Sequence, residues 1–526
     1  MNGHASSSDP PAEEKVGLLK ETDRDDLESE AGRLHIDDTA TITTTTAGTA
    51  SHSFAKWAAS VTATLPTNRS ALWRQFTRFL FFLVPSFFQG RHAREQIRPA
   101  KLPPTAYLDG MRGLAALFVF FCHYSYQAFA IAEGWGYGGR HQILKLPFIR
   151  LFYSGPMAVC VFFVISGYAL SYRPLKFIRS GSSAELANTM SSLIFRRGMR
   201  LFLPTITSTF MIVILLRIGA YDWTRGFAHS NVYMKRVREP HPERMHSTLA
   251  QLGDWIWQTF EFVHVYSWTH FHVNYDVHLW TIPVEFRCSL YLFLTVLGTA
   301  RLRTAWRFAT LAGIIAFTYR KSKWDMMLFF FGMVIAELDH IRGHHVQNPT
   351  LPASHKMESN SLWRRAAPWS WVALSIVGLY LMGQPDAKGA ETPGWVTLTS
   401  MIPEWWSVEK FRFWQSFGAV IFVFAVGRCP GWIWFFNTPV VQYFGKISYA
   451  IYLMHGPAIH TVGYHWEKLA WKITGVEGLQ YNFGFMLGSL FVIPTVIWWA
   501  DVFWRAVDIP SVKFAKWVES KLIVKA

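Results

Sequence analysis

Residues 107–124 read YLDGMRGLAALFVFFCHY, an apolar segment of helical length that contains Arg112 and His123. An ionisable side chain inside a membrane span is costly, so it usually faces the protein interior and has a function there. The two residues are eleven positions apart, which on an α-helix places them on one face, roughly 16 Å apart along the axis. The pattern predicts a site reached from the Arg112 end, with His123 near mid-depth. The alternative is that Arg112 only extends to a lipid headgroup and that His123 only hydrogen-bonds a neighbouring helix.

The composition is that of a helical membrane protein. Of the 526 residues, 51% are hydrophobic and only 16% are charged, and apolar runs of helical length recur along the chain. Such runs predict membrane-spanning helices. We therefore expect an all-α, polytopic membrane protein with about ten transmembrane helices. The expected spans are 111–131, 155–172, 201–219, 278–298, 304–320, 324–338, 369–383, 413–429, 439–461 and 481–504.

The formal net charge of +16 has a topological explanation. The basic residues cluster at the ends of apolar runs, which indicates orientation in a membrane rather than binding of nucleic acid. Their distribution predicts that both termini are cytosolic. One loop contradicts the rule, because Arg320, Lys321 and Lys323 would lie on the outer side. Either the two helices around this loop form a short hairpin, or one expected span is wrong.

The cysteines do not suggest cross-links or a metal site. The four cysteines lie in or beside apolar runs, with no CxxC motif and no Cys/His ligand spacing. A disulfide framework and a structural metal site are therefore not expected.

The ends of the chain differ from its middle. Residues 1–70 are acid-rich and then threonine-rich, which predicts a disordered cytosolic tail. Residues 71–104 begin with an apolar stretch interrupted by two arginines, which predicts an amphipathic segment lying in the membrane interface. We expect a transmembrane domain over 105–510 and a cytosolic C-terminal tail over 511–526.

Three titratable residues are expected at similar depth on separate helices. In the topology above, His123, Glu285 and His455 all lie between mid-depth and the outer end of their spans. Glu285 follows Pro283, which frees a backbone carbonyl within a helix. Intramembrane polar groups at matched depth favour a shared cavity over chance.

Two further polar patterns are open to two interpretations each. Arg197 and Arg200 share a helix face just before a span, where they could bind phosphate through their planar guanidinium groups or only set topology. Ser448, Tyr452 and His455 form one helical stripe. Such a stripe lines either a cavity or a contact with another helix.

Five blocks, in this order along the chain, resemble the membrane-bound acyltransferase family 3, a family of integral-membrane O-acyltransferases. They are LDGMRGLAALFVFFCHY, FFVISGYALSY, RRGMRLFLP, LWTIPVEF and ISYAIYLMHG. The resemblance covers roughly residues 105–515, and the ending WADVFWRAVDIPSVKFAKW is similar to fungal members. It implies about ten spans and transfer of an acyl group, usually acetyl from acetyl-CoA, to hydroxyls of sugars or small lipophilic molecules.

The chain departs from the family pattern at two places that bear on the acceptor. Pro283 precedes Glu285, and a long loop over about 220–277 is rich in histidine. We interpret the loop as a solvated connection, since its histidine spacings do not match metal ligands. The histidines are His229, His241, His246, His264, His270 and His272.

The resulting hypothesis is an acyl-CoA-dependent O-acyltransferase with acyl-CoA, in the first place acetyl-CoA, as co-substrate and no metal. His123 would act as general base, since its ordinary pKa lies near working pH. Glu285 and His455 would complete the catalytic group, and Arg112, Arg197 and Arg200 would hold the CoA phosphates. The expected substrate-binding residues are Ser166, Trp280, Ser448 and Tyr452, although helix packing is the favoured interpretation of Ser166-Gly167.

The expected partners are membrane lipid and a small-molecule or glycan acceptor. The expected location is the endoplasmic reticulum, the Golgi or the plasma membrane. The alternative function is a proton-coupled transporter in which His123, Glu285 and His455 relay protons. The absence of a detectable internal repeat in the sequence speaks against that alternative.

Overall fold

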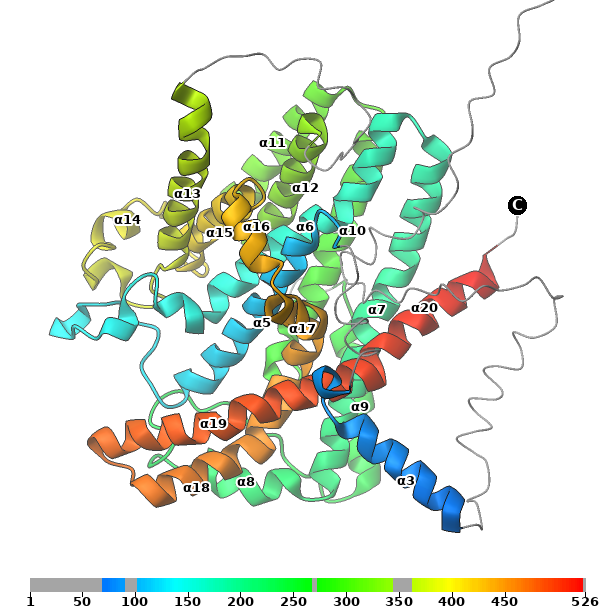
Figure 1. Cartoon of the computed structure of the whole chain (residues 1–526). Coiled ribbons are helices and arrows are strands. Elements are labelled where there is room, and N and C mark those ends of the chain that lie inside the picture. Colours follow the sequence, from blue (N-terminus) through cyan, green and yellow to red (C-terminus); the bar gives the residue numbers. More distant parts are fainter. Residues whose placement is uncertain (1–68, 90–101, 267–271, 344–361, 524–526) are drawn as a thin grey trace, which may run out of the picture.

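The computed structural model describes residues 69–89, 102–266, 272–343 and 362–523. Every regular element within these ranges is helical (Figure 1). The predicted all-α class is therefore confirmed for the described part of the chain. The N-terminal segment expected to be disordered lies outside the described residues up to position 68.

Four helices form the centre of the molecule: α5 (Ala106–Tyr126), α6 (Gly155–Ser180), α12 (Trp324–Arg342) and α17 (Pro439–Ala458). Beside them lie α7 (Ser183–Arg217), α10 (Thr281–Thr299) and α11 (Thr304–Arg320). The other α-helices are α3 (Arg69–Leu83), α8 (Ala220–Ala228), α9 (Thr248–Val263), α13 (Leu362–Met382), α14 (Val396–Ser400), α15 (Arg412–Val426), α16 (Pro430–Phe436), α18 (Tyr464–Thr474), α19 (Gly478–Phe503) and α20 (Ile509–Leu522).

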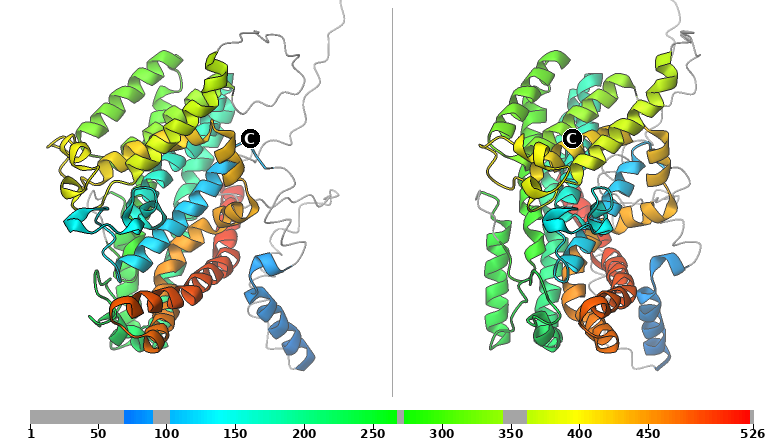
Figure 2. Two further views of the ribbon diagram at one scale, coloured as in Figure 1. Left: turned by 60° about the vertical axis from the view of Figure 1, so that its left-hand side comes forward. Right: turned by 90° about the vertical axis from the view of Figure 1, so that its left-hand side faces the viewer.

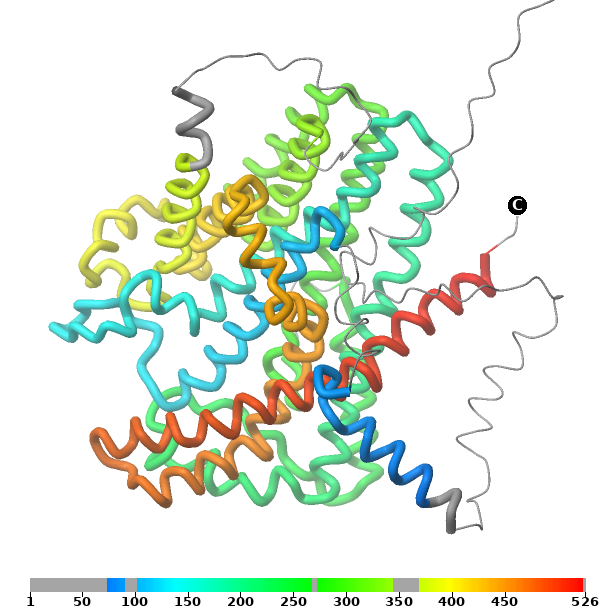
Figure 3. The backbone as a smooth tube through the Cα atoms, viewed as in Figure 1, coloured from blue at the N-terminus to red at the C-terminus, as the bar shows by residue number. Residues whose placement is uncertain are grey.

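Short helical turns connect these elements. The 3-10 turns are η1 (Ser86–Phe88), η2 (Tyr137–Gly139), η3 (Ile143–Lys145), η4 (Arg150–Tyr153), η5 (Val277–Trp280) and η6 (Gly389–Glu391). Two segments are π-helical, η7 (Ile459–Gly463) and η8 (Trp504–Asp508). Each π-helical segment continues the helix before it into the helix after it, as the tube in Figure 3 shows for α19, η8 and α20. Single π-turns inside helices are frequent at functional sites.

Glycines bring the central helices into backbone contact. A Cβ on Gly113 of α5 would lie 2.3 Å from the backbone nitrogen of Gly445 on α17, so only glycine allows this crossing. A Cβ on Gly167 of α6 would lie 2.1 Å from the carbonyl oxygen of Phe329 on α12. The packing interpretation of Gly167 is therefore confirmed. Close backbone approach of this kind is a common way to join helices in membranes.

The basic loop that broke the charge rule joins a hairpin. Helices α11 and α12 pack against each other and are linked only by residues 321–323. The bounds agree with the two expected spans at 304–320 and 324–338. The hairpin interpretation of this loop is thus the one that the structure supports.

Fewer helices than expected meet a length-and-composition test for spanning a membrane. Within the described residues four stretches qualify: Gly155–Ser180, Ser183–Arg217, Val277–Thr299 and Gly478–Leu522. A pair bent by 97°, α15 with α16, would add a fifth as a broken span or a re-entrant loop. All ten expected segments do overlap helices, but inner helices such as α12 carry buried acidic residues and are not uniformly apolar. The number of ten therefore remains a prediction.

Helix α3 extends away from the body of the molecule (Figures 1 and 2). The side chains of residues 73–81 are all exposed, including several large apolar ones. Its C-terminal end is fixed to α19 and η8, because Ser86 donates to Asp501 and Arg505 donates to the carbonyl of Phe82. This placement suits the expected interfacial segment, which stays a prediction.

The C-terminal segment expected to be a tail is helical as far as Leu522. Helix α20 packs against α7, with an ion pair of 3.0 Å between Arg196 and Glu519. The cytosolic location of this segment stays a prediction.

Candidate active site

Seven titratable residues meet at one end of α5, and we call this group the histidine centre. Helix α5 provides His123, α17 provides His455 and η7 provides His460. The loop between α8 and α9 provides Glu239 and His241, and the chain around η5 provides Asp276 and His278. Three of the predicted spans and two connecting segments thus supply one cluster.

Glu239 is the hub of the histidine centre. Its Oε1 lies 3.0 Å from Nδ1 of His123 and 2.8 Å from Nε2 of His278, and it also accepts a hydrogen bond from the Tyr126 hydroxyl. Its Oε2 lies 2.7 Å from Nε2 of His460. The side chain is only 1% exposed. A buried carboxylate needs such donors, since each unmade hydrogen bond to it is costly.

His278 lies between two carboxylates. Its Nδ1 is 2.6 Å from Oδ1 of Asp276, while its Nε2 faces Glu239. Carboxylates accept hydrogen bonds, so both ring nitrogens of His278 must donate. His278 is therefore an imidazolium balanced by two negative charges.

His460 and His241 continue the network away from Glu239. Nδ1 of His241 lies 3.0 Å from Nδ1 of His460, and Nε2 of His241 lies 2.9 Å from the carbonyl oxygen of Tyr221. The series from Glu239 through His460 and His241 to the Tyr221 carbonyl contains three hydrogen bonds, and each needs one N–H from an imidazole ring. Two neutral imidazoles carry only two N–H groups. The pair must hold one extra proton.

The extra proton belongs to His460, which contacts the Glu239 carboxylate directly. Burial, together with the neighbouring charge of His460, lowers the pKa of His241 to about 3, so His241 is neutral. The positive charges on His278 and His460 then balance those of Glu239 and Asp276. The centre as a whole is uncharged.

The same environment keeps both carboxylates ionised. Burial alone would raise the pKa of Glu239, but His278, His123 and His460 around it hold that pKa well below its usual range. Burial also opposes ionisation of Asp276, and the adjacent His278 outweighs it and lowers the pKa. Nearby cations and donated hydrogen bonds thus dominate over desolvation at both carboxylates.

His123 is the neutral and accessible member of the centre. Its Nδ1–H donates to Glu239, so its Nε2 presents a lone pair. The side chain is 25% exposed, unlike those of Glu239 and His278, which are 1% and 3% exposed. An imidazole oriented by a carboxylate, with the other nitrogen free, is the arrangement of a general base.

His455 is packed against this base. The ring centroids of His455 and His123 are 5.3 Å apart, and those of His455 and His278 are 4.6 Å apart. Nδ1 of His455 lies 2.7 Å from the carbonyl oxygen of Tyr452, one turn earlier in α17. The predicted convergence of His123 and His455 is therefore what the structure shows.

The loop that carries Glu239 is held in place at several points. Backbone amides of Arg236 and Val237 donate to the carbonyls of Gln127 and Tyr126 just after His123. The Lys235 ammonium donates to the carbonyl of Val476 at 2.7 Å. This attachment beside the end of α5 is what aligns Glu239 with His123.

Local backbone features bring α17 and η7 into register with the centre. A Cβ on Gly456 would lie 2.9 Å from Nδ1 of His278, so only glycine lets α17 approach this residue. Five residues along an ideal α-helix would turn His460 about 140° away from His455. The π-helical turn that begins at Ile459 changes this direction.

One ring nitrogen from each of His123, His278 and His455 lies within 4.8 Å of the other two, a grouping that could suggest a metal site. Both nitrogens of His278 already donate to carboxylates, and a donating N–H cannot ligate a metal. In this hydrogen-bonded arrangement, His123 and His455 are the two rings of the three that keep a nitrogen without a hydrogen-bond partner among the described residues.

The predicted arginines form a second group at the opposite end of α5, which we call the arginine centre. It contains Arg112, Arg197 and Arg200, together with Glu285 and Asp508. Arg200 interacts electrostatically with Arg197, Arg112 and Asp508. Asp508 is the last residue of the π-helical η8. The expected grouping of the three arginines is thus observed, with acidic partners that were not expected.

Glu285 belongs to the arginine centre rather than to the histidine centre. Its Oε1 lies 2.7 Å from NH2 of Arg197 and 3.0 Å from the Ser166 hydroxyl. Arg197 also donates to Ser289 at 3.1 Å. The side chains of Glu285 and Arg112 are 22% and 19% exposed, whereas that of Arg197 is 7% exposed and buried. These contacts of Glu285 are with Arg197 and Ser166 and not with His123, so they do not support the catalytic role predicted for it.

The remaining predicted substrate-binding residues are Tyr452, Ser448 and Trp280. The Tyr452 hydroxyl lies 2.6 Å from that of Thr281 and also donates to the carbonyl of His278. Ser448 is buried on α17. Trp280 lies 5.6 Å, from ring centroid to guanidinium carbon, from Arg412. Of the two interpretations of the polar stripe on α17, Tyr452 therefore fits the contact with another helix, since it hydrogen-bonds Thr281 of α10.

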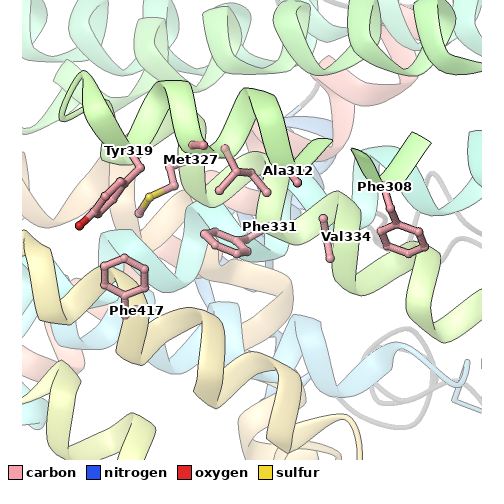
Figure 4. A pocket seen from close by; sticks show the side chains of 9 residues that line it. Phe308, Ala312, Tyr319, Met327, Phe331, Val334 and Phe417 are labelled. Carbon is pink, nitrogen blue, oxygen red and sulfur yellow. The ribbon is translucent and has the colours of Figure 1, made fainter. Parts of the chain in front are cut away.

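An apolar groove of about 580 Å³ lies apart from both centres, between α11, α12 and α15 (Figure 4). Its lining includes a single hydroxyl, that of Tyr319, and no member of either centre. Groups that could catalyse acyl transfer are missing from this lining. The other lining residues are Phe308, Ala312, Ile315, Ala316, Met327, Phe331, Val334 and Phe417.

Sequence reasoning missed Glu239, Asp276, His278 and His460. Glu239 and Asp276 lie in loops and His278 lies in the short 3-10 turn η5, where no α-helical periodicity indicates which side chain turns inward. Asp276-x-His278 immediately precedes the LWTIPVEF block, and that proximity was the available signal. The interpretation of the loop as a solvated connection is wrong at Glu239 and His241, which are buried.

Comparison with known proteins places the chain in a family. A family model described as an acyltransferase domain matches residues 105–505. The O-acetyltransferase PaAT-1 of Phomopsis amygdali is 33% identical over 477 residues, which are 87% of this chain and 91% of that protein.

Two other fungal proteins are similar over most of their length. The acyltransferase R4 of a Phoma species is 25% identical over 79% of this chain and 96% of its own. The acyltransferase clz18 of Cochliobolus lunatus is 27% identical over 78% of this chain and 95% of its own. No solved structure matches the chain.

Proposed function

The chain belongs to the acyltransferase family whose domain covers residues 105–505, and from that premise we propose that it transfers an acetyl group from acetyl-CoA to a hydroxyl of a small lipophilic molecule or glycan. It is an O-acyltransferase by family and by its similarity to a fungal O-acetyltransferase. The donor, the acceptor and the roles of individual residues are the proposed parts.

The observation that carries the proposal is the hydrogen bond of 3.0 Å between Nδ1 of His123 and Glu239. It fixes the ring orientation and leaves Nε2 as a base on an accessible side chain. Glu239 acts as a positioning residue through His123. The Glu239 carboxylate in contact with His123 would stabilise the imidazolium formed during reaction.

The proposed reaction consumes no net proton. Nε2 of His123 takes the proton of the acceptor hydroxyl while the hydroxyl oxygen attacks the carbonyl carbon of the thioester. The carbon–sulfur bond then breaks, and the proton passes from His123 to the departing CoA thiolate. The products are the ester and CoA.

The arginine centre supports binding of the donor. Planar guanidinium groups bind phosphates through paired charge-assisted hydrogen bonds. Arg112 and His123 share a helix about 16 Å apart along its axis. CoA phosphates held by Arg112, Arg197 and Arg200 would leave the pantetheine arm to reach the histidine centre.

The test uses membranes that contain the full chain, labelled acetyl-CoA and a host lipid and metabolite extract. We expect label to enter an extractable ester with the wild type. The His123→Ala variant, present in the membrane at equal amount, should lose transfer by about 10²- to 10⁴-fold, the usual range for a general base. Equal transfer by the variant would contradict the proposed role of His123.

The second candidate function is proton-coupled transport. The hydrogen-bonded series His123, Glu239, His460 and His241 favours it, since such series relay protons in membrane proteins. Acceptor-dependent release of free CoA by the purified protein separates the two functions. A transporter would release none.

A further inference from the structure

His455 carries a buried hydrogen-bond acceptor with no partner. Its Nδ1 faces the carbonyl oxygens of Tyr452 and Ile451, so that nitrogen carries the hydrogen. Nε2 of the neutral ring is then a lone pair, and nothing in the described structure donates to it. The residue is 0% exposed. An unfilled acceptor at this depth costs free energy and so indicates a ligand group.

This acceptor lies beside the proposed base. The rings of His455 and His123 are 5.3 Å apart between centroids, and a nitrogen of each lies within 4.8 Å of the other. Nε2 of His123 is also a lone pair, because its Nδ1–H is given to Glu239. The two rings are therefore close neighbours, and the N–H groups of His278, the ring that contacts both, are used by Asp276 and Glu239.

A single hydroxyl cannot satisfy both nitrogens. An alcohol carries one hydrogen, and in the proposed reaction that hydrogen is given to His123. Two donors are needed, and the uncharged state of the centre gives no preference for a cation. Two neighbouring hydroxyl groups on one molecule meet these requirements.

We propose that His455 forms a second-hydroxyl subsite, so that the acceptor is a vicinal diol of which one hydroxyl is acylated and the other donates to Nε2 of His455. The inference rests on the proposed O-acyl transfer and names the acceptor class. The first hydroxyl gives its proton to His123 and forms the ester, and CoA leaves with that proton. The second hydroxyl keeps its proton throughout, so His455 is a specificity-determining residue rather than a second base.

The experiment compares three small acceptors on the full chain in lipid nanodiscs with acetyl-CoA. They are cis-cyclohexane-1,2-diol, cis-cyclohexane-1,4-diol and cyclohexanol, which separate neighbouring hydroxyls from hydroxyl number. We expect kcat/KM for the vicinal diol to exceed the values for both others by about 10- to 100-fold, the effect of leaving a buried polar group unpaired. Ester product and free CoA are both measured.

Two variants of His455 sharpen the test. His455→Asn keeps an N–H for the Tyr452 carbonyl but places no acceptor at the Nε2 position, whereas His455→Gln can place a carbonyl oxygen there. The preference for the vicinal diol should fall to within about threefold in the Asn variant and be retained in the Gln variant. The wild-type preference is informative even where a variant does not fold.

Each outcome decides the inference. Equal use of the three acceptors by the wild type, or a preference that the Asn variant keeps, would overturn the second-hydroxyl subsite and leave O-acyl transfer intact. A proportional loss with all acceptors in both variants would also overturn it. Absence of transfer to every alcohol, together with no CoA release on addition of host extract, would contradict the proposed function and the inference with it.

Discussion

The histidine centre and the arginine centre lie at opposite ends of α5, and they hold their charges differently. In the histidine centre, Glu239 is 1% exposed and each of its bonds goes to a fixed ring or hydroxyl. In the arginine centre, Glu285 is 22% exposed and pairs with Arg197 at 2.7 Å. A buried network specifies one geometry, whereas partly exposed ion pairs can exchange partners with a ligand. The difference is consistent with the proposed division, in which the histidine centre carries the chemistry and the arginine centre binds the donor.

The two centres also share a structural feature. Each contains a residue from a π-helical segment, His460 in η7 and Asp508 in η8. Helix α17 passes near both, with Tyr452 and His455 at the histidine end. The same helices thus connect the centres, and substitutions can separate their roles.

The largest effect is expected for Glu239→Gln. The change leaves His460 without its carboxylate, leaves His278 with Asp276 alone, and removes the charged acceptor that orients His123. Breaking a buried ion pair at one partner costs about 3–5 kcal/mol, and we expect kcat to fall by about 100-fold or more. Thermal unfolding and kcat measure both effects.

The matched control is Glu243→Gln on the same loop. Glu243 is 85% exposed and lies 3.8 Å from Arg225. Its loss should change neither kcat nor the unfolding temperature measurably. If kcat and the unfolding temperature changed equally in the two variants, the special role of Glu239 in orienting His123 would be contradicted.

The next effect is expected for Arg200→Gln in the arginine centre. Losing a phosphate-binding cation should raise KM for acetyl-CoA by about 10-fold while kcat stays within about threefold. Arg217→Gln provides the control, since Arg217 lies at the far end of the same helix and donates to the carbonyl of Met245. A fall in kcat without a change in KM would place Arg200 in the chemistry instead.

Glu285→Gln tests the assignment of that carboxylate to the arginine centre. If Glu285 is a counter-ion of Arg197, its loss should change KM for acetyl-CoA and leave kcat within about 10-fold. The catalytic role expected from the sequence requires a kcat loss comparable to that of Glu239→Gln. Initial rates at varied acetyl-CoA distinguish these results.

The smallest effect is expected for Glu467→Gln, a buried carboxyl on α18 outside both centres. Burial raises the pKa of Glu467 to about 8, although Tyr124 donates to it. Above about pH 4.5 the unfolded state loses this proton while the folded state keeps it. The free energy of unfolding therefore falls as pH rises from there toward 8. The Gln variant should unfold a few degrees higher than wild type at pH 8, with a smaller difference at pH 5. An identical difference at both pH values would contradict the raised pKa.

Much of the fold and part of the site followed from residue patterns. Apolar runs located the helices, and the spacing of Arg112 and His123 placed these two side chains toward opposite ends of one helix. His455 was placed near His123 because both lie on helices whose depth could be estimated. Glu285 was placed wrongly beside them, since depth alone does not specify which neighbour a side chain faces.

The remaining site residues depend on structure that has no periodic signal. Glu239 reaches His123 because hydrogen bonds from Arg236 and Val237 attach its loop to the end of α5. His460 lies in a π-helical turn, which alters the α-helical direction on which sequence patterns rely. Long-range packing, rather than local sequence, determines both positions.

Equilibrium binding of labelled acetyl-CoA to the His123→Ala variant tests most directly whether the two centres divide donor binding from chemistry. We expect the variant to bind acetyl-CoA with a Kd within about threefold of wild type, because the arginine centre is intact, while acyl transfer is lost. Loss of binding in parallel with transfer, in a variant that unfolds at the wild-type temperature, would contradict it.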